Sequence, residues 1–200
     1  MTFRKYPEIT EQQIGTMTRS EKQKVTGYIG EYLAGNALLE KGWVVYDDQH
    51  YNPYDGQKDF HVMGPGDSSA KACEVKTQRA FLKWDYFTVR PEQFEKCRNC
   101  DYLVFVSTKI KDMWWDKEGK GNPYENKIYL VHEPSQLEWK EYSRDKRDMI
   151  GVTIKDNPFI IEIAQIADPW LAKVLEDIGI EDDSSFAKRA RYGNKYTEGL

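Results

Sequence analysis

Residues 59–78 have the sequence DFHVMGPGDSSAKACEVKTQ, which predicts two short strands that fold back on each other across a turn. The turn is predicted at GPGDSS, a cluster of turn-favouring residues, and apolar residues recur at every second position on both sides of it. A hairpin that pivots between Gly66 and Asp67 places Asp59 opposite Glu74, and residues opposite each other share a face of the sheet. We therefore expect an apolar face made of Phe60, Val62, Cys73 and Val75, and a polar face made of Asp59, His61, Glu74, Lys76 and Gln78.

Two carboxylates and a lysine come together on the polar face of this hairpin. Paired strand positions have their Cβ atoms about 4.5–5.5 Å apart, which lets Asp59 and Glu74 hold one divalent cation such as Mg²⁺ or Mn²⁺. Lys76 then projects beside them, where an ammonium can orient a metal-bound water and offset charge on a phosphate. This set predicts metal-assisted hydrolysis of a phosphodiester. The alternative is a solvated face on which one lysine neutralises two acids.

The composition narrows the class of protein. A chain of 200 residues predicts one domain, or a core with an appendage. A formal net charge of −4 excludes a general polycation, so any nucleic-acid surface has to be a local basic patch. Three cysteines without a secretory leader indicate a reducing compartment, and no apolar run reaches the roughly 18 residues of a membrane span. We expect a soluble, cytoplasmic protein that does not bind membranes.

A helix over residues 19–41 is predicted ahead of the hairpin. Thr18 and Glu21 have the spacing of a capping box, and Gly42 is suited to the C-terminal cap. Glycine inside a helix costs about 1 kcal/mol relative to alanine, yet this helix contains Gly27, Gly30 and Gly35. An acid framed by such residues is expected where a helix backbone presses on a sheet or a ligand, so we expect Glu31 to reach the same cation or its waters. The alternative is an exposed glutamate on a glycine-weakened helix.

The following elements complete a mixed sheet flanked by helices, and hence an α/β fold. Periodicity and turn signals predict a strand at 43–46, a third hairpin strand at 83–89, a helix at 91–99, and a strand buried on both faces at 102–106. Asp55 competes with Asp59 for the place of the first metal ligand, because it too precedes a strand. The pairing register favours Asp59.

Four short motifs follow one another along residues 27–107. They are Gly30-Glu31 on the helix, Asp59 opening a strand, Glu74-Val75-Lys76 on the next strand, and a helix and buried strand within residues 87–106. With these motifs the segment resembles the PD-(D/E)XK nuclease superfamily, and within it the archaeal Holliday-junction resolvase and intron-encoded endonuclease branches. Lys58 departs from the nominal motif, which has proline at that position.

The resemblance implies a Mg²⁺- or Mn²⁺-dependent nuclease with a restriction-endonuclease-like core. Asp59 and Glu74 would be metal ligands, and Lys76 would act on the attacking water. Glu31 would be an accessory acid that also reaches the metal. Gln78 would match a polar residue that some branches place just after the lysine.

The chain is expected to divide into an N-terminal arm at 1–18, the nuclease core at 19–107 and a C-terminal α+β extension at 108–200. This extension is predicted to pack on the core rather than form an independent domain. Its expected elements are strands at 128–131, 150–154 and 159–163 and a helix at 167–178.

Two parts of the extension are candidates for DNA contacts. Trp114 and Trp115 lie in a charged loop and are suited to stacking on unpaired bases or wedging a duplex, or else to anchoring the loop to the core. The basic tail is suited to phosphate contacts, or is simply a solvated end; its residues are Lys188, Arg189 and Arg191.

Cys97 and Cys100 have zinc or redox spacing, but four metal ligands are not visible and we expect two thiols at a helix end. No phosphate-binding loop or dinucleotide motif indicates an organic cofactor.

The sequence therefore predicts a Mg²⁺-dependent DNA endonuclease. One alternative is a structure-selective resolvase of branched DNA, which would act as a homodimer. Another is a nucleic-acid-binding module that keeps the fold without cutting.

Overall fold

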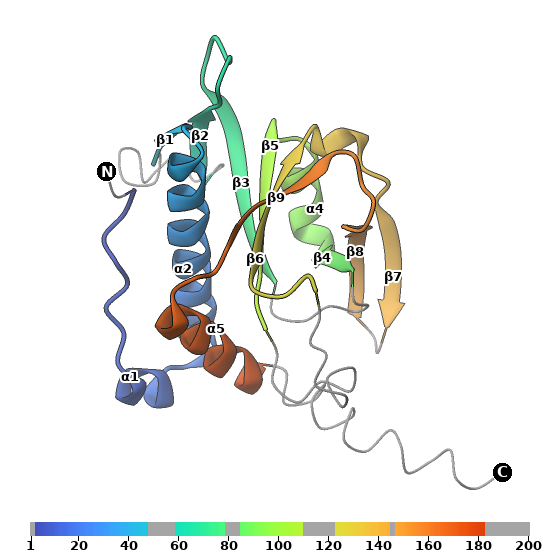
Figure 1. Cartoon of the computed structure of the whole chain (residues 1–200). Coiled ribbons are helices and arrows are strands. Elements are labelled where there is room, and N and C mark those ends of the chain that lie inside the picture. Colours follow the sequence, from blue (N-terminus) through green and yellow to red (C-terminus); the bar gives the residue numbers. More distant parts are fainter. Residues whose placement is uncertain (1–2, 48–58, 79–84, 110–122, 145–146, 183–200) are drawn as a thin grey trace, which may run out of the picture.

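The computed structural model describes residues 3–47, 59–78, 85–109, 123–144 and 147–182. Within these residues the strands form a six-stranded mixed sheet, in the order β1-β2-β3-β5-β6-β9, and a three-stranded sheet in the order β4-β8-β7. Helices flank the larger sheet (Figure 1). The larger sheet consists of β1 (Val44–Tyr46), β2 (Phe60–Met63), β3 (Lys71–Gln78), β5 (Tyr102–Ser107), β6 (Lys127–His132) and β9 (Ile160–Gln165). The smaller consists of β4 (Tyr86–Val89), β7 (Lys140–Arg144) and β8 (Arg147–Thr153).

The β2–β3 hairpin has the predicted register. Phe60 lies opposite Cys73 and His61 opposite Ala72 in the antiparallel pair. The other edge of β3 pairs with β5 in parallel, and α4 (Pro91–Arg98), with proline at its start, lies between these strands in the chain. Every residue of β5 is buried, as predicted for a strand covered on both faces.

One face of the larger sheet is covered by α2 (Arg19–Glu40). Its predicted capping box is present, with Thr18 as the N-cap and Glu21 as its partner. The glycine-rich part of α2 lies close to its neighbours: a Cβ on Gly30 would be 1.8 Å from Thr77 Oγ1 of β3, and one on Gly35 would overlap the ring of Phe3. The core on this face comprises Ala34, Ala37, Leu38, Phe60, Val62, Cys73, Val75, Tyr102, Val104, Val106, Ile128, Leu130 and Ile163.

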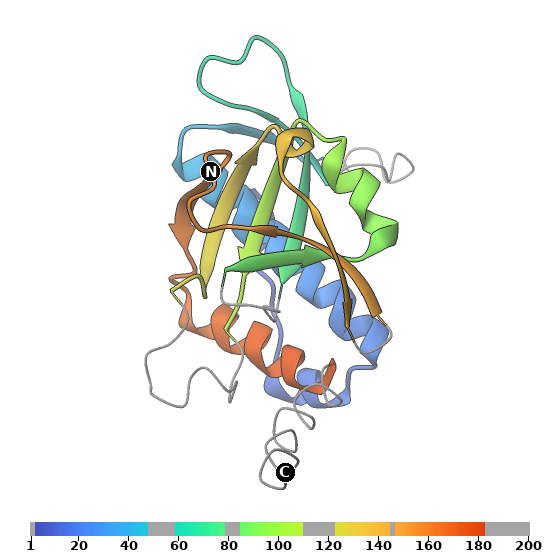
Figure 2. The same ribbon diagram turned by 90° about the vertical axis from the view of Figure 1, so that its right-hand side faces the viewer.

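The opposite face is covered by α4 and the three-stranded sheet, which lies across the larger sheet in Figure 2. Phe87 of β4 stacks on Phe105 of β5 with ring centroids 3.7 Å apart. The prediction of a third hairpin strand at 83–89 is wrong in its pairing. Its described part contains β4, which pairs with β8, because both edges of β3 are already occupied by β2 and β5.

The C-terminal elements join both sheets. The predicted strands at 128–131, 150–154 and 159–163 correspond to β6, β8 and β9, and β6 and β9 extend the larger sheet. No strand was predicted at β7, because its residues form a mixed-charge run without apolar alternation. The predicted helix is α5 (Pro169–Asp182), which packs with α2 and the short helix α1 (Glu11–Thr16). None of the described helices is long and apolar enough to span a membrane.

Candidate active site

Asp59 and Glu74 meet where the β2–β3 ladder ends. Backbone pairing stops at Phe60 and Cys73, and the next residue, Asp59, accepts the N–H of Val75 through its Oδ2 at 2.7 Å. Glu74 lies on the β3 face that α4 covers, and it is 0% exposed. The pair that the hairpin register predicts is therefore present, but it is buried beneath a helix rather than lying on a solvated face.

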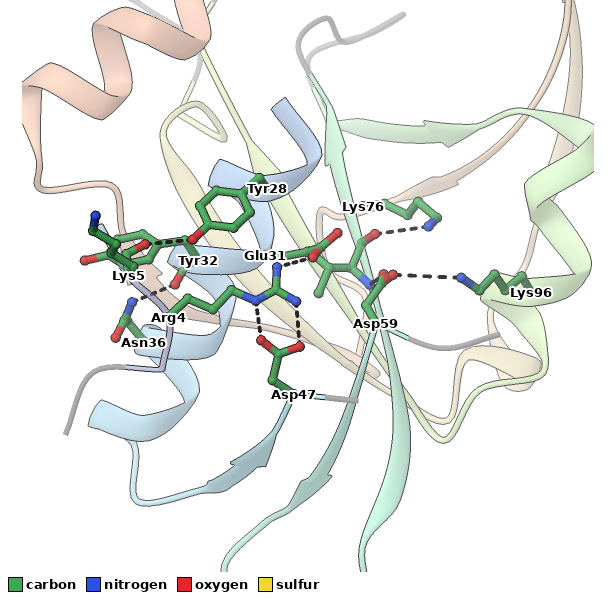
Figure 3. A network of polar contacts seen from close by, with 11 residues as sticks. Arg4, Lys5, Tyr28, Glu31, Tyr32, Asn36, Asp47, Asp59, Lys76 and Lys96 are labelled. Carbon is green, nitrogen blue, oxygen red and sulfur yellow. Dashed lines mark hydrogen bonds and ion pairs between the residues drawn. The ribbon is translucent and has the colours of Figure 1, made fainter. Parts of the chain in front are cut away.

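Two lysines reach these acids from different elements. Lys76 Nζ lies 2.5 Å from Glu74 Oε1 and donates to the carbonyl of Val75 at 3.1 Å. Lys96 Nζ, from α4, lies 2.9 Å from Glu74 Oε1. The same Nζ lies 3.8 Å from Asp59 Oδ1, a contact drawn in Figure 3. Asp59, Glu74, Lys76 and Lys96 thus form one carboxylate–lysine cluster between β3 and α4.

The carboxylate–lysine cluster leaves one oxygen of Glu74 for a further ligand. Burial raises the pKa of Glu74, and the charge of Asp59 raises it further. Together these two effects exceed the lowering of the pKa by the two lysines. Burial lowers the pKa of Lys76, but the attraction of Glu74 and Asp59 outweighs this and its pKa is raised. Glu74 Oε2 is buried and has no hydrogen-bond partner among the described residues. A buried carboxylate oxygen in this state is costly unless it binds a ligand.

Glu31 lies on the other side of Asp59 and is held by the N-terminal arm (Figure 3). Arg4 of the arm forms an ion pair with Glu31 and a two-pronged contact with Asp47, at 2.6 and 2.8 Å. Burial raises the pKa of Glu31, and the charge of Asp59 adds to the rise, although Arg4 opposes it. Glu31 is therefore close enough to Asp59 for the two charges to interact, and its carboxylate is bound to Arg4.

Asp59 and Glu74 fit a magnesium-type cation. They offer hard carboxylate oxygens, one of which has no hydrogen-bond partner within the described segments, and Mg²⁺ is commonly held by one or two carboxylates together with waters. Among the residues that the structure describes, no three His, Cys, Asp or Glu side chains are grouped to hold a metal ion together. Glu31 is thus not grouped with the other two acids as the sequence led us to expect.

The side chain of Gln78 connects the two sheets through hydrogen bonds. Its side-chain nitrogen donates to the carbonyl of Tyr86 at 2.9 Å, and its Oε1 accepts the N–H of Thr88. Both ends of the amide are thus bonded to the backbone of β4. The polar residue two positions after Lys76 connects the main sheet to the smaller one.

Comparison of the chain with protein-family models, with curated proteins and with solved structures found no match. The resemblance of residues 27–107 to the PD-(D/E)XK nucleases therefore stays a prediction from short motifs. The chemistry of the site has to be inferred from its own residues.

Several candidates lie outside the described residues: Asp55, Trp114, Trp115, Lys188, Arg189 and Arg191. Cys97 and Cys100 are buried thiols, and burial raises the pKa of the Cys97 thiol to about 12.

Sequence reasoning missed Lys96, Arg4 and Asp47. A weak signal existed for Lys96: it lies next to Cys97, which is buried, on the helix that follows the hairpin. No local pattern marks Arg4, because it reaches Glu31 across 27 positions of the chain.

Proposed function

We propose that this protein is a Mg²⁺-dependent DNA endonuclease, with Mn²⁺ able to substitute, built on a restriction-endonuclease-like core. One observation carries the proposal: Asp59 and Glu74 converge beneath α4 with Lys76 within 2.5 Å of Glu74, and Glu74 Oε2 is buried with no hydrogen-bond partner in the part of the chain that the structure describes. The order of α2, the β2–β3 hairpin, α4 and the buried strand β5 supports the same assignment.

Three members of the carboxylate–lysine cluster, Asp59, Glu74 and Lys76, have roles in this reaction. Asp59 and Glu74 would hold the cation, and a bound Mg²⁺ supplies Lewis-acid stabilisation of a phosphate and a more acidic water. In the metal-free protein Glu74 and Asp59 raise the pKa of Lys76 despite its burial, and an ammonium at this position could orient the attacking water and stabilise negative charge on the phosphate. The hydrogen bond from Lys76 to the carbonyl of Val75 fixes the direction of that side chain.

The proposal is tested by a cleavage assay on supercoiled plasmid, linear duplex, single-stranded DNA, RNA and a four-way junction, with Mg²⁺, Mn²⁺ or EDTA. Cleavage should require the metal and fall by a factor of about 100 or more in Lys76→Met. Lys71→Met is the matched control, because Lys71 lies on the same strand and pairs with Asp67 at 3.1 Å. Circular dichroism checks that both variants are folded.

Other outcomes identify the alternatives. Preference for the four-way junction by a dimer indicates a resolvase of branched DNA. DNA binding in EDTA without cleavage indicates a binding module, and RNA as the preferred substrate corrects the choice of DNA. If the folded protein neither cuts nor binds nucleic acid, the proposed function is wrong.

A further inference from the structure

Lys96 lies between the two carboxylates of the candidate metal site. Its Nζ is 2.9 Å from Glu74 Oε1 and 3.8 Å from Asp59 Oδ1, so one ammonium contacts both acids. Lys76 reaches the same Oε1 of Glu74, but it also donates a hydrogen bond to a backbone carbonyl, that of Val75. The two lysines therefore differ: Lys76 is held by its own strand, while Lys96 bridges the acids from α4.

The charges of the carboxylate–lysine cluster balance without a metal. Asp59 and Glu74 carry two negative charges, and Lys76 and Lys96 carry two positive ones. A divalent cation bound to the same carboxylates would leave a buried excess of two positive charges. Because like charges a few ångströms apart repel strongly where water is excluded, the metal and the bridging ammonium disfavour each other.

Lys96 is the lysine that can leave the cluster. Its side chain is 34% exposed, whereas that of Lys76 is 16% exposed. A lysine side chain has a flexible four-carbon stem, and a hydrated ammonium costs little to return to water. The more exposed side chain of Lys96 is therefore the better placed of the two to return to water.

We propose that Lys96 is an exchangeable counter-ion, which neutralises Asp59 and Glu74 in the metal-free protein and is displaced when a divalent cation binds. This inference rests on the proposed function, since it concerns the same metal site. Lys96 thereby lowers the affinity of the site for the metal, because the two compete for the same carboxylates. Once released, its ammonium is available to an anion on the exposed side of the site, such as the phosphodiester of the substrate.

Metal binding by full-length variants tests the exchange, with Mn²⁺ titrated by calorimetry and by electron paramagnetic resonance. Lys96→Met should bind Mn²⁺ about tenfold more tightly than the wild type, a typical coupling between two competing sites. The matched control is Lys127→Met, which removes a lysine from an ion pair with Glu162 at 2.6 Å elsewhere on the same sheet and should leave the affinity unchanged.

Labelling of the wild type gives a second measurement that does not depend on a variant folding. Acetic anhydride acylates exposed amines, and peptide mass spectrometry reports each lysine separately. Saturating Mg²⁺ should increase the labelling of Lys96 at least threefold, whereas Lys127 should keep its labelling.

The outcomes separate the two ideas. Equal or weaker Mn²⁺ binding by a folded Lys96→Met, or unchanged labelling of Lys96 in Mg²⁺ by a wild type that binds it, overturns the exchange alone. Failure of both proteins to bind Mn²⁺ overturns the metal-dependent function, and the exchange with it.

Discussion

Gly30 of α2 lies directly over Thr77 of β3, so that a Cβ at position 30 would be 1.8 Å from Thr77 Oγ1. We expect Gly30→Ala to destabilise the protein by about 1 kcal/mol, because overpacking outweighs the gain in helix propensity. Gly27→Ala is the control in the same helix, since a Cβ there meets Glu31 Oε1 at 3.9 Å. It should stabilise by about 0.5–1 kcal/mol.

Urea denaturation of the two variants measures this difference. The double variant Gly30→Ala/Thr77→Ala should recover part of the loss, because it removes the atom that overlaps. Equal stabilisation by both glycine substitutions would show that α2 does not need close approach at Gly30.

Arg4→Ala should destabilise the protein by about 3 kcal/mol, since it removes the guanidinium that contacts two nearly buried carboxylates. The side chains of Arg4, Glu31 and Asp47 are only 8%, 16% and 12% exposed. Arg4→Lys should recover only part of the loss, because an ammonium cannot reproduce the fork of contacts to Asp47.

Urea denaturation in EDTA compares these variants with Lys5→Ala at the neighbouring position. Lys5 pairs with Glu8 on the surface, and both side chains are largely exposed. Its substitution should change stability by less than about 0.5 kcal/mol. A similarly small effect of Arg4→Ala would mean that the arm does not hold Glu31 in solution.

The hairpin could be predicted from the sequence because what determines it is local. The GPGDSS turn and the alternation on each side of it set the register, and a slip by one residue would expose Phe60 and Val62. The capping box of α2 is equally local, with Thr18 and Glu21 three positions apart.

The rest of the site depends on contacts between distant segments. Alternation at 83–89 indicated a strand but not its partner, which the occupied edges of β3 determine. Lys96 reaches Glu74 only because α4 packs over that face of β3, and Arg4 reaches Glu31 only because the arm lies along α2. No periodic pattern encodes either arrangement. The sequence therefore predicted the acids and Lys76, but not the helix and the arm that pack over them.

Gln78→Ala should destabilise the protein by about 2 kcal/mol, because it leaves the carbonyl of Tyr86 and the N–H of Thr88 without the partner that Gln78 provides. Gln78→Glu should also destabilise, since a carboxylate can accept from Thr88 but cannot donate to Tyr86. Thermal unfolding measures both variants against Gln93→Ala, an exposed glutamine on α4. If Gln78→Ala lowers cleavage without lowering stability, the amide acts in the reaction rather than between the sheets.

Glu74→Gln should raise the stability of the metal-free protein at pH 7, on the order of 1 kcal/mol, while abolishing its response to metal. Burial and the charge of Asp59 raise the pKa of Glu74 in the fold, so the charged carboxylate is less favourable in the folded protein than in the unfolded chain. The free energy of unfolding of the wild type therefore falls as pH rises from the unfolded pKa, about 4.3, through the higher folded pKa. Glutamine does not titrate, so the advantage of the variant should grow between pH 4 and pH 7.

Magnesium should reverse this order. At a concentration 100 times its dissociation constant, a cation that binds only the folded wild type stabilises it by about 2.7 kcal/mol, and Glu74→Gln has lost one carboxylate of the site. Urea denaturation in EDTA and in Mg²⁺, across this pH range, measures both effects beside Glu92→Gln, an exposed glutamate on α4. If Glu74→Gln is the less stable protein in EDTA at pH 7, attraction to Lys76 and Lys96 outweighs the cost of burying the charge, and Glu74 needs no metal to be stable where it lies.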